Sequence, residues 1–303
     1  MTAHSDMRGD SIHVALDQPG HTLHVKRIRQ REDGIPVLMI HGSIENGRIF
    51  YSKDLTKGFA PYLARHGYDV YVADLQGRGQ SRPRMSRSST YGQTDVIHTD
   101  IPACMDAIRD LRGDAPVHWV SHSWGGVLML SHLARYDVNV ISQVHFAVKR
   151  RITARSWAYY DMLWFRWHLM GRLFNLLYGY LPADRFGFGA DGEPREHFRQ
   201  VSAWLGPNSR WIDNVDGYDY GAAARSMVLP PALYLAGVDD PVLGNPKDVR
   251  LLMEETGQDN ATFRLLGRAH GNRVDYGHND ILTHPQAVDD HFPEVLDWMR
   301  GWE

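Results

Sequence analysis

The chain begins with a segment in which apolar and polar residues alternate. Residues 12–17 and 21–30 follow this period of two, and Pro19-Gly20 lies between them. Such alternation is typical of a strand with one buried face, and a Pro-Gly pair favours a turn. We therefore predict an antiparallel hairpin at the start of a sheet.

The strands expected after the hairpin are short, continuous apolar runs. Parallel strands that are covered on both faces lose the polar alternation, so runs of this kind indicate a parallel sheet. The runs occupy residues 36–40, 68–73, 117–120, 138–144, 232–236 and 262–266.

Helix-like stretches separate these runs. Residues 54–66, 95–111 and 246–255 each end at or near a glycine, which can adopt the left-handed conformation of a helix cap. A last helix is predicted over residues 285–302, where apolar residues recur at helical spacing. Helices between parallel strands predict an α/β protein with a mostly parallel central sheet flanked by helices.

Residues 150–229 have a different character. They contain no clear parallel strand, yet they hold about half of the aromatic side chains of the chain. A length of 303 residues is compatible with one large α/β domain that carries an insertion. We therefore predict a core domain formed by residues 1–149 and 230–303, and an inserted helical cap formed by residues 150–229.

Composition narrows the possible classes of protein. The formal net charge is −3 without a long run of like charges, which disfavours nucleic-acid binding. The single cysteine, Cys104, excludes an internal disulfide and a cysteine-based metal cluster. Residues 1–10 lack the apolar core of a secretion signal, and the uncharged stretch 115–134 carries too many polar groups to span a bilayer. We expect a cytoplasmic protein without stable membrane insertion.

One strand end carries a candidate nucleophile. The run 117–120 leads into Ser121-His122-Ser123-Trp124-Gly125-Gly126, and a helix-compatible stretch follows. In a Gly-x-Ser-x-Gly elbow, a tight turn lifts the serine oxygen off the sheet and directs the next backbone N–H at a developing oxyanion. Ser121 replaces the first glycine with a small residue, so Ser123 is the predicted nucleophile.

In this stretch the chain resembles the α/β-hydrolase superfamily, and two further segments agree. His41-Gly42-Ser43 follows the run 36–40, where the family places an oxyanion loop, and residues 74–81 are similar to the turn Asp-x-x-Gly-x-Gly-x-Ser. The stretch 41–48 is similar to the loop of the monoacylglycerol lipase and lysophospholipase-like branch. The resemblance implies the α/β-hydrolase fold and a Ser-Asp-His catalytic triad.

The resemblance also implies residue roles. Asp240 falls on the position of the family's catalytic acid, with Asp239 as the neighbouring alternative. His278, in a Gly-His-Asn-Asp context, is the expected base, and His270 is its rival. The oxyanion donors would be the backbone N–H groups of Ser43 and Trp124. The remaining substrate-binding candidates are His41, Gly42, Trp157, Tyr160 and Trp164.

No cofactor is expected. The 17 histidines do not fall into a spacing known for zinc hydrolases, so no metal site is predicted either. The function implied is a serine hydrolase that cleaves small-molecule carboxylic esters, of monoacylglycerol or lysophospholipid type, through an acyl-enzyme on Ser123. A thioesterase, amidase, acyltransferase or C–C hydrolase would need the same triad, and a non-catalytic binder on this scaffold is the competing class. The aromatic cap would allow transient contact with a lipid interface.

Overall fold

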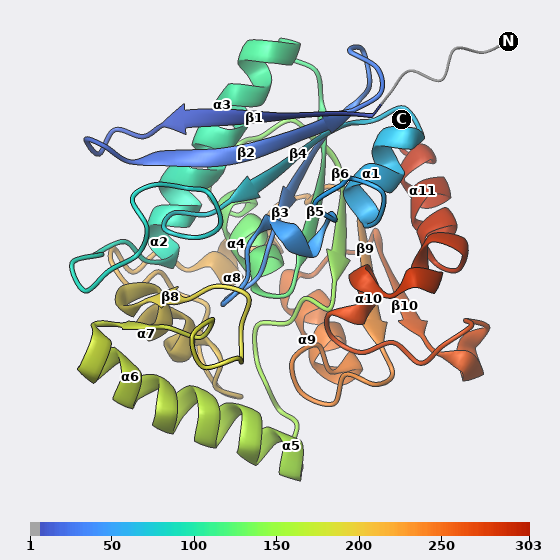
Figure 1. The fold of residues 1–303 in the computed structure, drawn as a ribbon. Helices are drawn as coiled ribbons and strands as arrows, with labels where there is room; N and C mark the ends of the chain where they lie inside the picture. Colours follow the sequence, from blue (N-terminus) through green and yellow to red (C-terminus); the bar gives the residue numbers. More distant parts are fainter. Residues whose placement is uncertain (1–6) are drawn as a thin grey trace, which may run out of the picture.

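The centre of the molecule is an eight-stranded sheet with the strand order β1-β2-β4-β3-β5-β6-β9-β10 (Figure 1). The computed structural model describes residues 7–303. β1 pairs with β2 and β2 with β4 in antiparallel fashion, and all other neighbours are parallel, as predicted. The strands are β1 (Arg8–Ala15), β2 (Thr22–Arg29), β3 (Pro36–Ile40), β4 (Asp69–Asp74), β5 (Val117–His122), β6 (Val140–Phe146), β9 (Ala232–Gly237) and β10 (Ala261–Leu266).

The pairing of β3 with β5 positions the predicted nucleophile. Both strands are completely buried, and their register ends with Ile40 beside Ser121. Because parallel strands end at the same edge of a sheet, the loop after β3 and the turn after β5 begin side by side. Residues 41–46 and 121–126 are thereby brought together although about 80 residues separate them.

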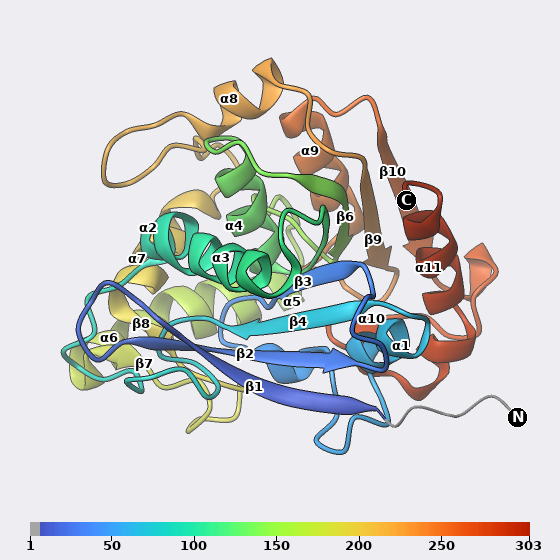
Figure 2. The same ribbon diagram turned by 90° about the horizontal axis from the view of Figure 1, so that it is seen from above.

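Helices cover both faces of the sheet (Figure 2). One apolar core packs against α1 and α11, and the other packs against α3, α4, α8 and α9. The helices outside the 150–229 segment are η1 (Gly47–Ile49), α1 (Phe59–Arg65), α2 (Gln93–Asp95), η2 (Val96–Asp100), α3 (Ile101–Arg112), α4 (Trp124–Leu133), α9 (Pro246–Thr256), η4 (Arg268–His270), α10 (Asp280–Thr283), η5 (Pro285–Asp289) and α11 (Phe292–Arg300).

Two predicted helices are shorter than expected. The helix predicted over residues 54–66 begins only at Phe59, because the Asp54 carboxylate accepts hydrogen bonds from Ser52 and Thr56 and holds that stretch as a turn. The helix predicted over residues 285–302 is divided, since the chain leaves helical geometry at Asp290. Apolar periodicity continues across both interruptions, which is why it overestimated the helices.

The segment 150–229 is mainly helical. A continuous helix of α5 (Trp157–Tyr159), the π-helical η3 (Tyr160–Met170) and α6 (Gly171–Tyr178) runs along the lower edge of the molecule in Figure 1. β7 (Tyr180–Leu181), β8 (Glu193–Pro194), α7 (Arg195–Trp204) and α8 (Tyr220–Ser226) complete the segment. Its interpretation as a cap stays a prediction. Among residues 7–303, no helix has the length and apolar character that a membrane span requires. Residues 1–6, part of the stretch used for the secretion argument, lie outside the described residues.

Candidate active site

Ser123 lies at the apex of a strained turn between β5 and α4. Its φ of 50° and ψ of −127° place a non-glycine residue in the left-handed half of backbone space, which is costly unless the surroundings enforce it. The constraint comes from tight packing, because a Cβ on Gly125 would lie 2.5 Å from the carbonyl oxygens of Ile40 and His41. Gly125 is therefore required by its close approach to the end of β3.

A hydrogen-bonded chain connects Ser123 to two distant residues. The Nε2 atom of His278 lies 3.0 Å from Ser123 Oγ, and its Nδ1 atom lies 2.6 Å from Asp240 Oδ2. Burial lowers the pKa of His278 below its ordinary value, although the charge of Asp240 opposes this effect. Burial raises the pKa of Asp240, but the charge of His278 and its hydrogen bond outweigh burial and leave that pKa low. A neutral imidazole between a hydroxyl and a carboxylate is the arrangement of a general base.

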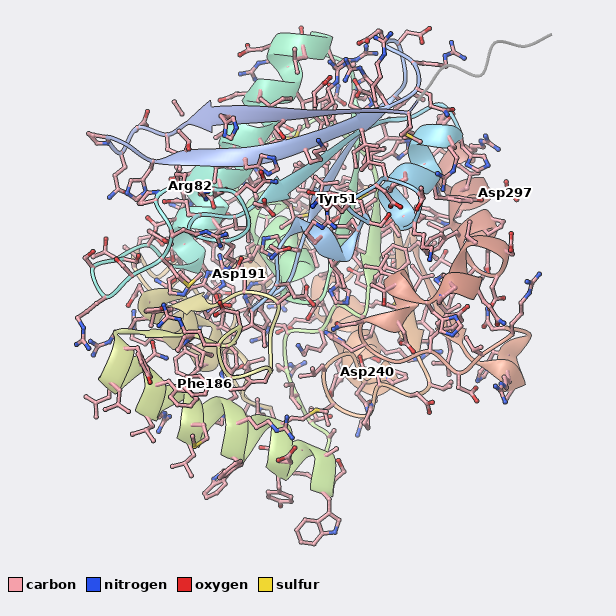
Figure 3. All side chains as sticks on the ribbon, viewed as in Figure 1. Tyr51, Arg82, Phe186, Asp191, Asp240 and Asp297 are labelled. Carbon is pink, nitrogen blue, oxygen red and sulfur yellow. The ribbon has the colours of Figure 1, made fainter. Side chains whose placement is uncertain are left out.

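The two sequence alternatives lie elsewhere. Asp239 is exposed, whereas Asp240 is 2% exposed and faces the His278 ring. His270 is exposed in η4, and the structure gives it no contact with Ser123 among the described residues. Figure 3 shows Asp240 at the edge of the sheet that faces the α5–α6 helix.

The two residues predicted to donate to the oxyanion, Ser43 and Trp124, line one cavity together with Ser123. Trp124 is the first residue of α4, so its N–H has no acceptor within the helix. Gly42 packs so closely on Ser123 that a Cβ at this position would lie 2.8 Å from the serine Cβ. This close approach brings the next residue, Ser43, to the wall of the same cavity.

The loop that carries Ser43 is held by the 183–194 segment. Ile44 has a φ of 53°, its N–H donates to Glu193 Oε2 at 2.6 Å, and its carbonyl accepts from Ala190 and Asp191. The Glu193 carboxylate in turn pairs with Arg78 in a fully buried ion pair. A segment about 150 residues away in sequence thereby fixes the peptide that follows Ser43.

Above these groups lies a cavity of about 420 Å³. Its lining includes Ser43, Ser123, Trp124 and His278, and the remaining walls are mostly apolar. A space of this size is typical of a small-molecule site. Residues from η3 line its outer side, namely Met162, Leu163, Arg166 and Trp167.

Comparisons with known proteins agree with this architecture. A family model described as "alpha/beta hydrolase fold" matches residues 35–168. A carboxylesterase from Bacillus subtilis superposes with a TM-score of 0.59 at 14% identity, covering 99% of this chain and 94% of that one. A haloalkane dehalogenase from Bradyrhizobium elkani gives a TM-score of 0.63 at 18% identity, covering 97% and 98%. The chain therefore has the α/β-hydrolase fold.

The curated relatives match over a shorter range. "Lipase 1" of Drosophila melanogaster is 26% identical over 140 residues, which is 43% of this chain and 32% of that protein. The chain therefore spans about a third of the length of the curated relatives it matches. The structural neighbours include an esterase and a dehalogenase, so the fold alone does not define the reaction.

Behind the candidate triad lies an ionic pair that no sequence motif revealed. His122 Nδ1 lies 2.8 Å from Glu45 Oε2, and His122 Nε2 lies 2.9 Å from the carbonyl oxygen of His278. Because both ring nitrogens face acceptors, both carry hydrogen and the ring is an imidazolium. Burial lowers the pKa of His122, but the Glu45 charge more than offsets it and raises that pKa above its ordinary value. Burial raises the pKa of Glu45, yet His122 brings it down to about 2.

Glu45, His122 and His278 place their ligand atoms within 4.8 Å of one another, a spacing that could hold a metal ion. All four ring nitrogens are already engaged, however, by Glu45, the His278 carbonyl, Asp240 and Ser123. The three side chains therefore belong to a hydrogen-bonded network. The absence of a metal cofactor stays a prediction.

Only some of the predicted substrate-binding residues lie near Ser123. Gly42 contacts Ser123, but His41 is fully buried and its ring bonds the Gly42 carbonyl and the Leu75 N–H. Trp157, Tyr160 and Trp164 are 91%, 50% and 58% exposed and do not line the cavity. The aromatic content of this segment does not indicate which face of the helix turns toward the cavity. Leu163 lies on that face, in place of the predicted aromatic residues.

Proposed function

We propose that this protein is a serine hydrolase that cleaves carboxylic esters through an acyl-enzyme on Ser123. The observation that carries the proposal is the unbroken Ser123–His278–Asp240 hydrogen-bond chain at the wall of a mostly apolar cavity. The lipase name of the similar Drosophila melanogaster protein agrees with this class of reaction.

The proposed reaction begins with proton transfer. His278 Nε2 accepts the Ser123 proton as Ser123 Oγ attacks the acyl carbonyl carbon, and Asp240 stabilises the imidazolium that forms. The N–H groups of Ser43 and Trp124 would then hold the oxyanion; one such donor is worth about 100-fold or more in rate. His278 returns the proton to the departing alcohol.

Water completes the cycle. In the empty leaving-group position, His278 takes a proton from water as it attacks the acyl-enzyme, and the acid leaves with Ser123 restored. The apolar side chains Ile152, Leu163 and Leu205 line the cavity and would accommodate a hydrocarbon acyl chain. This lining supports the acyl-lipid type of ester that the resemblance of residues 41–48 implies.

The proposed cap would also contact lipid. The α5–α6 helix exposes a row of large apolar side chains (Figure 3), which a water-facing helix normally lacks. The row comprises Trp157, Tyr160, Trp164, Phe165, Leu169, Leu173, Leu176 and Leu177. Transient docking at a lipid surface would cover this row without inserting a helix across the bilayer.

A fluorophosphonate probe together with 4-nitrophenyl esters of short and medium chain length tests the proposal. The wild type should be labelled and should turn over the esters, while Ser123→Ala should do neither. His278→Ala should lower kcat by roughly 10³-fold or more, whereas the matched variant His270→Ala should leave it unchanged. Thioester, amide and C–C substrates belong in the same panel. Absence of both labelling and turnover in the wild type would contradict the enzyme assignment and favour a binding protein.

A further inference from the structure

Lys149 is a buried cation at the cavity. It follows β6, is only 4% exposed, and lines the same cavity as Ser123 and His278.

Within the described part of the chain, the Lys149 ammonium has no ion pair of its own. Among residues 7–303, the structure shows no hydrogen bond or salt bridge to its Nζ atom, and its contact is with the face of the Trp124 ring at 5.8 Å. Other buried basic side chains are paired directly with a carboxylate. These pairs are Arg27 with Asp69, Arg78 with Glu193, and Arg150 with Glu255.

The carboxylates that lie nearest to Lys149 form their hydrogen bonds with other groups. Asp240, Asp248 and Glu45 all interact electrostatically with Lys149. Asp240 bonds His278, Glu45 bonds His122, and Asp248 accepts from the N–H and hydroxyl of Thr153. Burial lowers the pKa of Lys149 to about 8, while these carboxylates favour the charged form. The side chain therefore carries a positive charge at neutral pH that a bound ligand could neutralise.

We propose that Lys149 binds a carboxylate carried by the ester substrate, so that the substrate is an anionic ester with its charged group inside the cavity. This inference rests on the proposed ester hydrolysis and narrows its substrate class. A buried ammonium is costly to leave without a hydrogen-bond acceptor, and a carboxylate supplies the missing acceptor through a charge-assisted hydrogen bond.

A carboxylate fits better than a phosphate dianion. The two other cations of the cavity, Arg48 and Arg166, are exposed. Arg166 pairs with Asp161 at 2.9 Å, and Arg48 lies over the Tyr51 ring. The inner part of the site thus offers one ammonium group without a direct hydrogen-bond acceptor, and one carboxylate can fill that place. A second charge on the ligand would be buried without a partner.

The test compares anionic esters with neutral isosteres on both sides of the scissile bond. On the acyl side the pair is mono-4-nitrophenyl glutarate and 4-nitrophenyl hexanoate. On the alcohol side it is 4-(butanoyloxy)benzoate and 4-methylphenyl butanoate. The kcat/KM ratio of anionic to neutral ester is measured for the wild type, for Lys149→Met, which keeps an unbranched chain, and for Lys149→Arg, which keeps the charge.

In at least one pair, Lys149→Met should lower this ratio by roughly 10- to 100-fold, the effect of one hydrogen bond to a charged group. Lys149→Arg keeps the positive charge and should therefore retain part of the wild-type preference for the anionic ester. A structural role alone would change both esters of a pair equally, so an unchanged ratio in both pairs overturns the inference while ester hydrolysis stands.

Binding separates the inference from the proposed chemistry. If the wild type hydrolyses no ester, calorimetry of binding of the monoanion monomethyl glutarate to Ser123→Ala and to Ser123→Ala/Lys149→Met decides whether Lys149 binds a carboxylate. Weaker binding without Lys149 by roughly 10-fold or more supports a carboxylate site. Equal affinity, or no binding to either protein, overturns it.

Discussion

The imidazole of His122 joins Glu45 to the backbone of His278, with Nδ1 2.8 Å from the Glu45 carboxylate and Nε2 2.9 Å from the His278 carbonyl. The Gly42 N–H donates to the same Glu45 oxygen at 2.9 Å. One ion pair therefore ties the peptide beside Ser43 to the peptide that presents the proposed base. Its role is positioning, since neither charged group touches the reacting atoms.

Glu45→Gln should destabilise the folded protein and lower kcat. The substitution leaves the buried His122 charge without a counter-ion, which costs roughly 3–5 kcal/mol in free energy of unfolding. Urea unfolding followed by tryptophan fluorescence measures the change in the free energy of unfolding. In addition, kcat should fall because the His278 peptide shifts. The exposed Glu254→Gln is the matched control, with an expected change below about 0.5 kcal/mol. Wild-type stability in Glu45→Gln would show that the pair carries no charge.

The kcat/KM profile should rise with pH through a midpoint below the ordinary histidine pKa of 6.5. The base must be neutral to act, and burial, His122 and Lys149 all lower the pKa of His278. Removing a nearby positive charge makes the imidazolium easier to form, so Lys149→Met should move the midpoint to higher pH. Profiles measured with a neutral ester test this directly; a shift to lower pH would contradict the assigned electrostatics.

Gly42→Ala should impair catalysis. The added Cβ would lie 2.8 Å from Ser123 Cβ and 2.9 Å from Glu45 Oε2, which forces the serine or the loop to move. A displacement of about 1 Å can cost about 100-fold in rate. Gly206→Ala is the control, because its Cβ would approach another atom no closer than 3.7 Å. Equal kcat values for the two variants would mean that the loop adapts without cost.

Two neighbouring residues of η3 should separate lipid contact from substrate contact. Trp164 is exposed and Leu163 lines the cavity. Trp164→Ala should weaken co-sedimentation with phospholipid vesicles while leaving kcat/KM for a soluble ester intact. Leu163→Ala should do the reverse, by enlarging the cavity and changing the preference for acyl-chain length. Loss of both properties in both variants would indicate that the helix has unfolded instead.

Local patterns in the sequence determined the framework of this protein. The strands after residue 35, the hairpin before them and the turn around Ser123 follow from apolar runs, alternation and the small residues that a tight turn requires. These signals are local, because they depend on backbone geometry and on which faces of a short segment are buried. Chain order and the family resemblance then limited the acid and the base to two candidates each.

Tertiary structure alone decided which groups meet. It turns Asp240 rather than Asp239 toward His278, and it brings Glu45 against His122 across 77 residues of chain. It also places Lys149 at the cavity without an ion pair among residues 7–303, and it turns Leu163 inward while Trp164 faces out. Such contacts depend on the register of strands and the rotation of helices within the packed molecule. A side chain's type and position in sequence do not specify either one.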